Sequence, residues 1–160
     1  MVGLRTNVVR RSIIRPLMTS QPLSLAILAA EFNKKLVDFM VDAATDEATS
    51  SGAKVVRVVR VPGSYEMPLV AQRLLGAADV DALVVLGYIE RGQTQHGEVM
   101  GHVVHAALVD LSLLHEKPLG IGIIGPGATP EQAETRKNDY ARAAVRASLA
   151  AHRAVTEVGA

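Results

Sequence analysis

A three-layer α/β/α sandwich on a four-stranded parallel sheet, of the flavodoxin-like type, is the fold that the sequence predicts. Two observations support it. Short apolar or β-branched runs alternate four times with longer segments of helical periodicity. The connections between these segments are short, and strands that alternate with helices in this way form parallel sheets covered on both faces.

Each expected element follows from its own residue pattern. Continuous apolar or β-branched runs mark the strands, because a strand buried on both faces needs no polar alternation. Apolar residues at helical spacing mark the helices, and capping or breaking residues mark their ends. The expected order is strand 23–29, helix 34–50, strand 54–61, helix 66–77, strand 80–86, helix 97–115, strand 118–124 and helix 130–156.

Several boundaries depend on particular residues. Asn33 is a candidate N-cap of the first helix, and Thr129 is a candidate N-cap of the last. Gly87 is expected to close the third strand, and Gly125-Pro126-Gly127 the fourth. The helix over 97–115 carries an apolar stripe that we expect to face the core.

The chain length suits one domain, which we expect over residues 23–160. Residues 1–22 differ, because arginines are scattered through them and no acid precedes Glu31. We expect a basic N-terminal extension with three open interpretations: a flexible tail, a targeting peptide, or an over-extended start upstream of Met18. An additional strand supplied by this extension is a further alternative.

Composition excludes several classes of function. The 160 residues contain no cysteine, which excludes disulfides, thiolate metal sites and cysteine nucleophiles. The net charge is +1 and aromatic residues make up only 3%, so we expect no nucleic-acid partner. The apolar runs have the length of strands, so we expect no membrane partner. P-loop, Gly-x-Ser-x-Gly and His-Glu-x-x-His motifs do not occur in the sequence.

Polar and glycine-rich residues concentrate after each expected strand, in the segments 32–33, 62–66, 91–96 and 125–129. In open parallel sheets, ligands bind outside the carboxyl ends of the strands. The sequence therefore predicts one site built from several loops.

Candidate functional residues lie in or near these segments. His96 is the strongest, because imidazole gives and takes protons near neutral pH; a surface or capping histidine is the alternative. Gly92-Gln93-Thr94 leads into a helix N-terminus, which favours an anion. Arg136 could add a bidentate phosphate contact, or belong to a solvated helix face. The ring of Phe32 could stack on a heterocycle, or belong to the core.

Two other patterns are interpreted as chance matches. Residues 120–125, Gly-Ile-Gly-Ile-Ile-Gly, fit the dinucleotide-binding pattern but lie inside the expected fourth strand instead of after the first. His102 and His105 share a helix face, yet no third ligand accompanies them at a metal-binding spacing. We therefore expect neither a nucleotide fingerprint nor a metal site.

At these same loops the sequence resembles the lumazine synthase family. Phe32-Asn33 matches the family's Phe-Asn pair, and residues 61–68 resemble its Val-Pro-Gly-Ala/Ser-Phe/Tyr-Glu-Ile/Met-Pro segment. Residues 91–96 are similar to its Arg-Gly-Glu-Thr-x-His loop, and residues 125–129 to the corresponding segment of its archaeal branch. The resemblance covers residues 23–152, with four motifs in the correct order and spacing.

The resemblance implies a function. Family members condense 5-amino-6-(D-ribitylamino)uracil with 3,4-dihydroxy-2-butanone 4-phosphate, release phosphate and water, and use no metal or organic cofactor. The product is 6,7-dimethyl-8-ribityllumazine, made in the penultimate step of riboflavin biosynthesis. We accordingly expect a cytoplasmic transferase with small-molecule substrates and no cofactor.

The resemblance also implies roles for particular residues. His96 would carry protons. Residues after the first three strands and in the fourth would bind the pyrimidine and the ribityl chain: Phe32, Asn33, Gly63, Ser64, Tyr65, Glu66, Tyr88, Ile89, Glu90 and Ile121. The phosphate would be bound by Gly92, Gln93, Thr94 and Arg136.

Family members form pentamers in which neighbouring subunits share each site, and many pack twelve pentamers into an icosahedral shell. The resemblance therefore implies a homo-oligomer, either a pentamer or a 60-subunit shell. In such an assembly Arg136 could serve the site of the neighbouring subunit.

The sequence departs from the family at Tyr88-Ile89-Glu90, where a run such as Cys-Val-Ile is usual, and at Gln93, which replaces a common Glu. Glu90 puts a charge near the pocket, where burial without a partner is costly. It could pair with Arg91, point outward or alter specificity. Two other functions stay open at this point: a shell-forming or flavin-storing homologue with little activity, and an archaeal-type riboflavin synthase.

Overall fold

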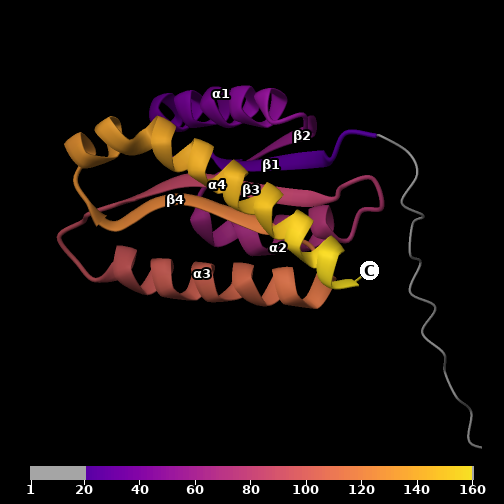
Figure 1. Ribbon diagram of the computed structural model, residues 1–160. Helices are drawn as coiled ribbons and strands as arrows, with labels where there is room; N and C mark the ends of the chain where they lie inside the picture. Colours follow the sequence, from indigo (N-terminus) through magenta and orange to yellow (C-terminus); the bar gives the residue numbers. More distant parts are fainter. Residues whose placement is uncertain (1–20, 160) are drawn as a thin grey trace, which may run out of the picture.

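A computed structural model describes residues 21–159 as a parallel sheet between two layers of helices (Figure 1). The expected N-terminal extension and its additional strand concern residues that lie almost entirely outside this range. The strands are β1 (Ser24–Ala30), β2 (Lys54–Val61), β3 (Ala82–Glu90) and β4 (Leu119–Ala128). The helices are α1 (Lys34–Ser50), the short 3₁₀ helix η1 (Ser64–Glu66), α2 (Met67–Leu75), α3 (His96–His115) and α4 (Pro130–Gly159).

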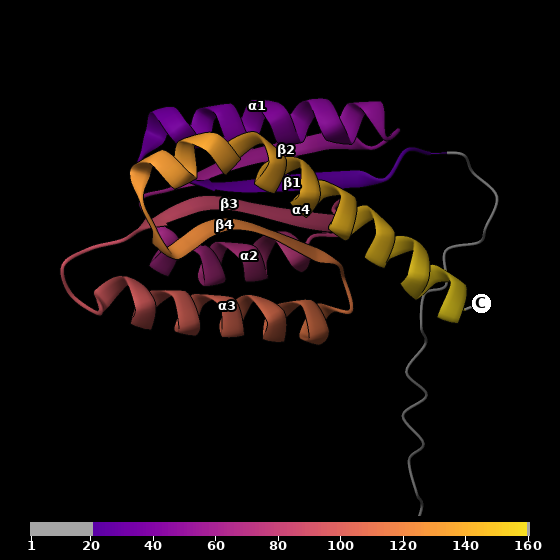
Figure 2. The same ribbon diagram turned by 60° about the vertical axis from the view of Figure 1, so that its left-hand side comes forward.

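The four strands follow the order β2-β1-β3-β4, and every neighbouring pair is parallel. Helices α1 and α4 cover one face of the sheet, and α2 and α3 cover the other (Figures 1 and 2). The predicted fold class is confirmed. Because all strands run the same way, their carboxyl ends and the loops that follow them meet at one edge.

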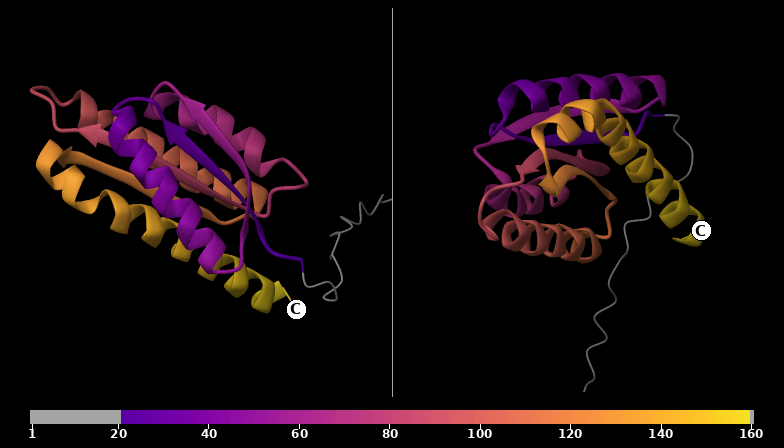
Figure 3. Two further views of the ribbon diagram at one scale, coloured as in Figure 1. Left: turned by 90° about the horizontal axis from the view of Figure 1, so that it is seen from above. Right: turned by 90° about the vertical axis from the view of Figure 1, so that its left-hand side faces the viewer.

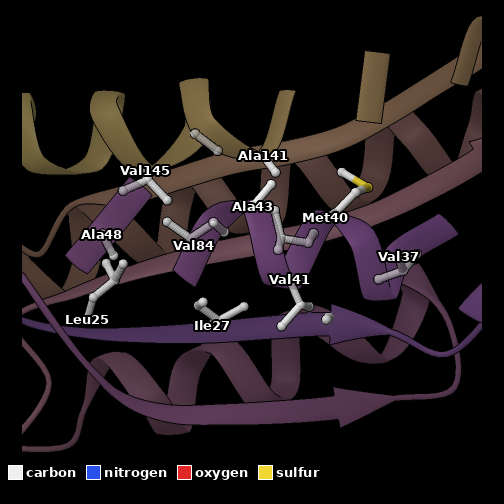
Figure 4. Close-up of a cluster of buried hydrophobic side chains, with 14 of the residues drawn as sticks. Leu25, Ile27, Val37, Met40, Val41, Ala43, Ala48, Val84, Ala141 and Val145 are labelled. Carbon is white, nitrogen blue, oxygen red and sulfur yellow. The ribbon is translucent and has the colours of Figure 1, made fainter. Parts of the chain in front are cut away.

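The core on the α1/α4 face is tightly packed. Leu25, Ile27 and Val84 of the sheet point toward α1 and α4, where Met40 and Val145 meet them (Figure 4). All five side chains are fully buried. This cluster fixes the position of α1, and therefore of the loop that precedes it.

Two glycines of β4 allow α4 to approach the sheet closely. A Cβ atom on Gly120 would lie 2.1 Å from the backbone oxygen of Ala144, and one on Gly122 would lie 3.1 Å from the Ala144 Cβ. Gly120 and Gly122 therefore serve helix packing, and the glycine pattern over residues 120–125 lies inside β4. This confirms that it is not a dinucleotide fingerprint.

The opposite face is covered less completely. On α3, only Gly101, Val104 and Leu108 are buried. Val103 and Leu114 belong to the stripe that was expected to face the core, yet they are exposed, so that expectation was only partly right. The reason is that apolar residues occur all around α3, which lies at the outside of the molecule opposite α1 (Figure 3).

Helix α3 is also the one helix within residues 21–159 that is long and apolar enough to cross a membrane, with a mean hydropathy of 1.2. The sequence analysis missed this, because His, Gly and Asp interrupt its apolar runs. The finding concerns length and composition alone.

Two strands run further than expected, which corrects the roles given to glycines. Strand β3 continues through Gly87 to Glu90, because backbone pairing continues from Gly87 to Ile123 of β4. Strand β4 likewise continues through residues 125–127 to Ala128, whose carbonyl oxygen accepts a bond from Arg91 N–H at 3.0 Å. The third loop is correspondingly short and begins at Arg91.

The two predicted helix caps differ. The hydroxyl of Thr129 accepts a hydrogen bond from Gln132 N–H at 3.3 Å, and Thr129 N–H donates to the Gln132 side-chain oxygen at 3.0 Å. This reciprocal pair is a capping box and confirms the prediction for α4. Asn33 occupies the N-cap position of α1 but makes no side-chain capping bond, because its backbone is left-handed, with φ 56°.

Candidate active site

A cavity of about 590 Å³ opens at the carboxyl edge of the sheet, where ligands of parallel α/β proteins bind. Three of the four predicted loops contribute to it. Its lining residues are Phe32, Pro62, Gly63, Ser64, Tyr65, Glu66, Tyr88, Ile89, Glu90, Arg91, Gly92, Thr94, His96, Gly97 and Met100.

The segment after β2 forms one wall of the cavity as a closed turn. Gly63 N–H donates to the Glu66 carboxylate at 2.9 Å, which closes the η1 turn. Ser64 is buried, and Met67, which follows the turn, is fully buried beneath it. Glu66 is exposed and keeps acceptor capacity beyond the bond from Gly63, so it can accept hydroxyl donors from a ligand.

His96 is the first residue of α3, and its side chain lies at the cavity. Its backbone N–H faces the Thr94 hydroxyl at 3.4 Å. The imidazole meets the ring of Tyr65 edge to face, with ring centroids 5.9 Å apart and an angle of 63° between the planes. Within residues 21–159 no carboxylate forms an ion pair with it. An exposed imidazole at a cavity can exchange protons with a ligand or with water.

The loop before α3 combines exposed backbone with a helix N-terminus. Gly92 and Thr94 line the cavity, whereas Gln93 is exposed outside it. The opposite side of this loop borders a second cavity of about 440 Å³, in which Pro126 and Gly127 take part. Free N–H groups of the first helical turn and the helix dipole make this place suitable for a phosphate.

Phe32 and Asn33 are adjacent in sequence but lie at different cavities. The ring of Phe32 is 56% exposed at the main cavity, so one ring face is available for stacking. Asn33 lines a neighbouring cavity of about 460 Å³ between α1 and the start of α4. Its left-handed backbone turns its side chain away from that of Phe32.

The end of β3 forms the floor and rim of the cavity. Tyr88 and Ile89 are buried, and the Tyr88 hydroxyl donates to the Ala128 carbonyl oxygen at 2.9 Å. Desolvation, with smaller contributions from the carboxylates of Glu90 and Glu131, raises the pKa of the Tyr88 phenol above its usual value. The phenol therefore stays neutral near pH 7 and keeps donating this bond.

Glu90, the residue that departs most from the family pattern, is exposed at the rim. It forms no ion pair with Arg91 among the ion pairs of residues 21–159. The sequence analysis left open whether Glu90 pairs with Arg91, points outward or alters specificity, and its exposure fits an outward-pointing side chain. Because the carboxylate is exposed, it carries no cost of burial.

Besides Asn33 and Gln93, two further predicted residues do not line the cavity within one chain. Ile121 lies in the middle of β4, paired with Val85, and is partly buried against the α2/α3 face. Arg136 is exposed on α4. Neither belongs to the lining residues of the cavity described here.

Four lining residues were given no individual role in the sequence analysis, although two of them lie in its predicted site segments: Pro62, Arg91, Gly97 and Met100. Signals for them existed. Pro62 and Arg91 belong to the segments after the second and third strands, and Met100 follows His96 by four residues, which places it on the same helix face. Gly97 packs on the end of β3, because a Cβ there would lie 3.2 Å from the Glu90 carbonyl oxygen.

The histidines further along α3 have ordinary roles. His105 Nδ1 lies 2.7 Å from the Gly101 carbonyl oxygen, and His102 lies near Glu98 at 3.9 Å. No group of three or more potential metal-binding side chains occurs within residues 21–159. An exposed imidazole, a glycine-containing loop at a helix N-terminus and an exposed aromatic ring thus share one cavity. Fold and cavity together define an α/β enzyme that acts on small, polar, phosphorylated molecules.

Comparison with known proteins specifies the family. The family model described as 6,7-dimethyl-8-ribityllumazine synthase matches residues 22–157. A protein of that name from Metallosphaera sedula is 41% identical over 132 residues, which cover 82% of this chain and 87% of the relative. The protein of that name from Aeropyrum pernix is 41% identical over 128 residues, covering 79% and 87%. The one from Pyrobaculum arsenaticum is 39% identical over 125 residues, covering 78% and 83%.

The chain therefore belongs to the 6,7-dimethyl-8-ribityllumazine synthase family, as the motifs at its loops predicted. Members of this family are transferases of riboflavin biosynthesis with small-molecule substrates. The three relatives named above are archaeal, in agreement with the archaeal character of residues 125–129.

Proposed function

We propose that this cavity condenses 5-amino-6-(D-ribitylamino)uracil with 3,4-dihydroxy-2-butanone 4-phosphate to give 6,7-dimethyl-8-ribityllumazine, phosphate and water. One observation carries the proposal: Phe32, Glu66, Gly92, Thr94 and His96 come from three separate loops and converge at one cavity. These groups match the three parts of the reactants, namely a flat pyrimidine, a polyhydroxylated chain and a phosphate.

The pyrimidine and its ribityl chain are assigned to the wall formed by the first two loops. The exposed ring of Phe32 stacks on the pyrimidine. Gly63 and Ser64 contribute to the wall beside the ribityl chain, and Glu66 accepts bonds from its hydroxyls with the capacity that the Gly63 bond leaves free. Tyr88, Ile89 and Glu90 form the floor and rim beneath the ring.

The phosphate is assigned to the loop that precedes α3. Backbone N–H groups of Gly92 and Gln93 and the hydroxyl of Thr94 provide donors, and the positive end of the α3 dipole provides a favourable field. This places the leaving group within the same loop-to-helix junction as His96.

His96 is assigned the proton transfers. The 5-amino nitrogen attacks the ketone carbon of the butanone and water leaves, which gives an imine. Proton removal from the hydroxyl-bearing carbon then expels the phosphate and leaves an enol, which takes up a proton at its terminal CH2 and becomes a methyl ketone. Attack of the ribitylamino nitrogen on this new ketone closes the ring with loss of a second water. Holding two reactants together supplies much of the acceleration, and a proton carrier adds about 10²–10⁴-fold.

The site is completed by a second copy of the chain. Arg136 and Ile121 do not line the cavity of their own chain, so the proposal assigns them to the cavity of a neighbouring subunit. The exposed apolar residues of α3 support association, because large apolar surfaces usually mark contacts: Val99, Val103, Val109, Leu113 and Leu114. The assembly is a pentamer or a 60-subunit shell, which light scattering distinguishes by mass.

The proposed place of action is the cytoplasm, since both reactants are small water-soluble molecules, one of them phosphorylated. The activity is tested by mixing the purified protein with the two reactants and following the fluorescence of the lumazine against a reaction without protein. Acceleration is expected. A folded oligomer that binds the product but gives no acceleration would favour a flavin-storing role and contradict the proposal.

The role of His96 is tested by His96→Ala, with His152→Ala as the matched control because His152 lies on α4 outside the cavity. His96→Ala should slow turnover about 10²–10⁴-fold without abolishing it, because orientation of the reactants remains. His152→Ala should turn over like the unchanged protein. Complete inactivity of a folded His96→Ala protein would contradict the expectation that orientation of the reactants alone still accelerates the reaction.

The shared site is tested by mixing subunits. Arg136→Ala should mainly weaken use of the phosphorylated reactant, because it removes a charge-assisted contact. When Arg136→Ala and His96→Ala subunits are unfolded and refolded together in equal amounts, roughly one quarter of the sites regain both groups, since each group is intact in half of the subunits. Mixed oligomers that are no more active than the average of the two variants would place Arg136 in its own subunit's site.

A further inference from the structure

Within residues 21–159 the imidazole of His96 has no polar partner that orients it, which is unusual for a residue assigned as a proton carrier. Its ring takes part in none of the side-chain hydrogen bonds or ion pairs of residues 21–159; only its backbone N–H is engaged, by Thr94. General bases are normally held by a third group, often a carboxylate. Here the described neighbour of the imidazole is the ring of Tyr65, in an edge-to-face contact with centroids 5.9 Å apart.

We propose that Tyr65 is a positioning residue that holds the His96 imidazole toward the cavity through this edge-to-face ring contact. The inference deepens the proposed function and rests on it, because it concerns the orientation of the proton carrier in the condensation. The contact depends on the ring of Tyr65 and not on its hydroxyl group.

Tyr65 is suited to this role because the turn that carries it is fixed. Ser64 on one side is buried, and Met67 two residues further on is fully buried. The bond from Gly63 N–H to the Glu66 carboxylate closes the same turn. Tyr65 itself is 45% exposed, so its ring stands above this anchored base and faces the cavity.

His96 needs such a support because its backbone is fixed while its side chain is not. The helix that it begins is held against β3 at Gly97, where a Cβ would lie 3.2 Å from the Glu90 carbonyl oxygen. The side chain is exposed, and an exposed imidazole samples several rotamers. An edge-to-face aromatic pair favours one arrangement about 2- to 10-fold, and so raises the population with the imidazole at the cavity.

The kinetic test is a double-mutant cycle between Tyr65→Leu and His96→Ala, with Tyr65→Phe as the conservative variant and light scattering as a check of assembly. Tyr65→Leu should lower kcat about 2- to 10-fold, and Tyr65→Phe should keep it near the original value. In the His96→Ala background, Tyr65→Leu should cause no further loss of kcat. A contribution of Tyr65 to reactant binding would appear in KM in both backgrounds.

Two results would overturn the proposal. An equal loss of kcat in both backgrounds would show that Tyr65 acts independently of His96. A loss for Tyr65→Phe as large as that for Tyr65→Leu would show that the hydroxyl group matters and the ring contact does not.

A second readout needs no catalysis and separates this inference from the proposed reaction. The chain has five histidines, and the Cε1–H signal of His96 in histidine-labelled protein is assigned as the one that His96→Ala removes. Tyr65→Leu should shift this signal, because the ring current of Tyr65 disappears, and Tyr65→Phe should largely preserve it. An unchanged His96 signal in Tyr65→Leu would refute the contact. If Tyr65→Leu shifts the His96 signal as expected but the unchanged protein catalyses no condensation, only the proposed function would be refuted.

Discussion

The two faces of the sheet differ in how completely one chain covers them. Against α1 and α4, the glycines of β4 let α4 approach within backbone contact, and Glu47 of α1 pairs with Arg142 and Arg146 of α4 at 3.6 and 3.2 Å. Against α2 and α3, five large apolar side chains of α3 stay exposed. The first side is held by close backbone packing and ion pairs between its helices, although Phe39, Tyr140, Val155 and Val158 stay exposed there. The second side leaves more large apolar side chains uncovered, on α3 above all, for another molecule to cover.

The candidate site also divides into a part that one chain brings together and a part that it does not. Phe32, Glu66 and His96 reach one cavity from loops of a single chain. Ile121 and Arg136 lie on β4 and α4, outside that cavity. The comparison teaches that the part of the site on the loops after β1, β2 and β3 is organised by folding, and that the part on β4 and α4 is proposed to act only after association.

The largest effect is expected from a charge on the exposed face of α3. Val103→Asp should dissociate the proposed oligomer, because an unpaired carboxylate would be buried at the contact. Val155→Asp is a matched control, since both valines lie on helices and both are 55% exposed. Light scattering should show a lower mass for Val103→Asp only. Equal dissociation of both variants would mean that apolar exposure by itself does not identify the contact face.

A smaller but clear loss of stability is expected when a side chain is inserted between β4 and α4. Gly120→Val should lower the free energy of unfolding by about 3 kcal/mol, because its Cβ would lie 2.1 Å from the Ala144 carbonyl oxygen and the helix must move. Urea unfolding measures this loss. Gly159→Ala, with nothing within 4 Å of the new Cβ, should leave stability nearly unchanged. Similar stability of both variants would contradict close packing on this face.

The smallest effect is expected in acid, at Asp38 of α1, which pairs with Lys34 of the same helix and with Arg60 of β2. A hydrogen bond from Lys34, aided by the nearby charge of Arg60, lowers the pKa of Asp38 below 3.8, although desolvation opposes the shift. A carboxyl whose pKa is lowered by folding stabilises the protein above its unfolded pKa, and this contribution is lost as the pH falls through the folded value.

Asp38→Asn should therefore lower the unfolding midpoint slightly at pH 7 and make little difference at a pH below the lowered pKa of Asp38, where the carboxyl of the unchanged folded protein is protonated as well. Thermal unfolding at both pH values measures this. A difference between the two proteins that is equal at both pH values would show that the charge of Asp38 is not the cause.

Much of the fold could be predicted because local pattern and tertiary role agree. Strand β2 and helix α1 have the predicted bounds, since β-branched residues and helical spacing are both local signals. The predicted ends at Gly87 and at residues 125–127 were wrong because strand length is decided by pairing with a neighbouring strand, and β3 and β4 continue to pair beyond these glycines. A glycine in a sequence does not reveal whether a turn or a close contact requires it.

The residues of the candidate site could be predicted where they lie in loops that directly follow a strand. His96, Glu66 and Phe32 were identified because the carboxyl ends of parallel strands share one edge. Met100 and Gly97 were missed because their relation to the cavity depends on how α3 sits against β3. The place of Asn33 in a neighbouring cavity depends on a left-handed backbone that the sequence does not specify.

The sequence by itself determined the fold class, the order of strands and helices, and the loops that carry the chemistry, because hydrophobic periodicity and loop composition are properties of neighbouring residues. Only the tertiary structure decided that β4 glycines admit α4, that α3 keeps an uncovered apolar face, and that Tyr65 meets His96. Each of these features joins residues that are distant in sequence, and contacts of that kind depend on how whole elements pack in space.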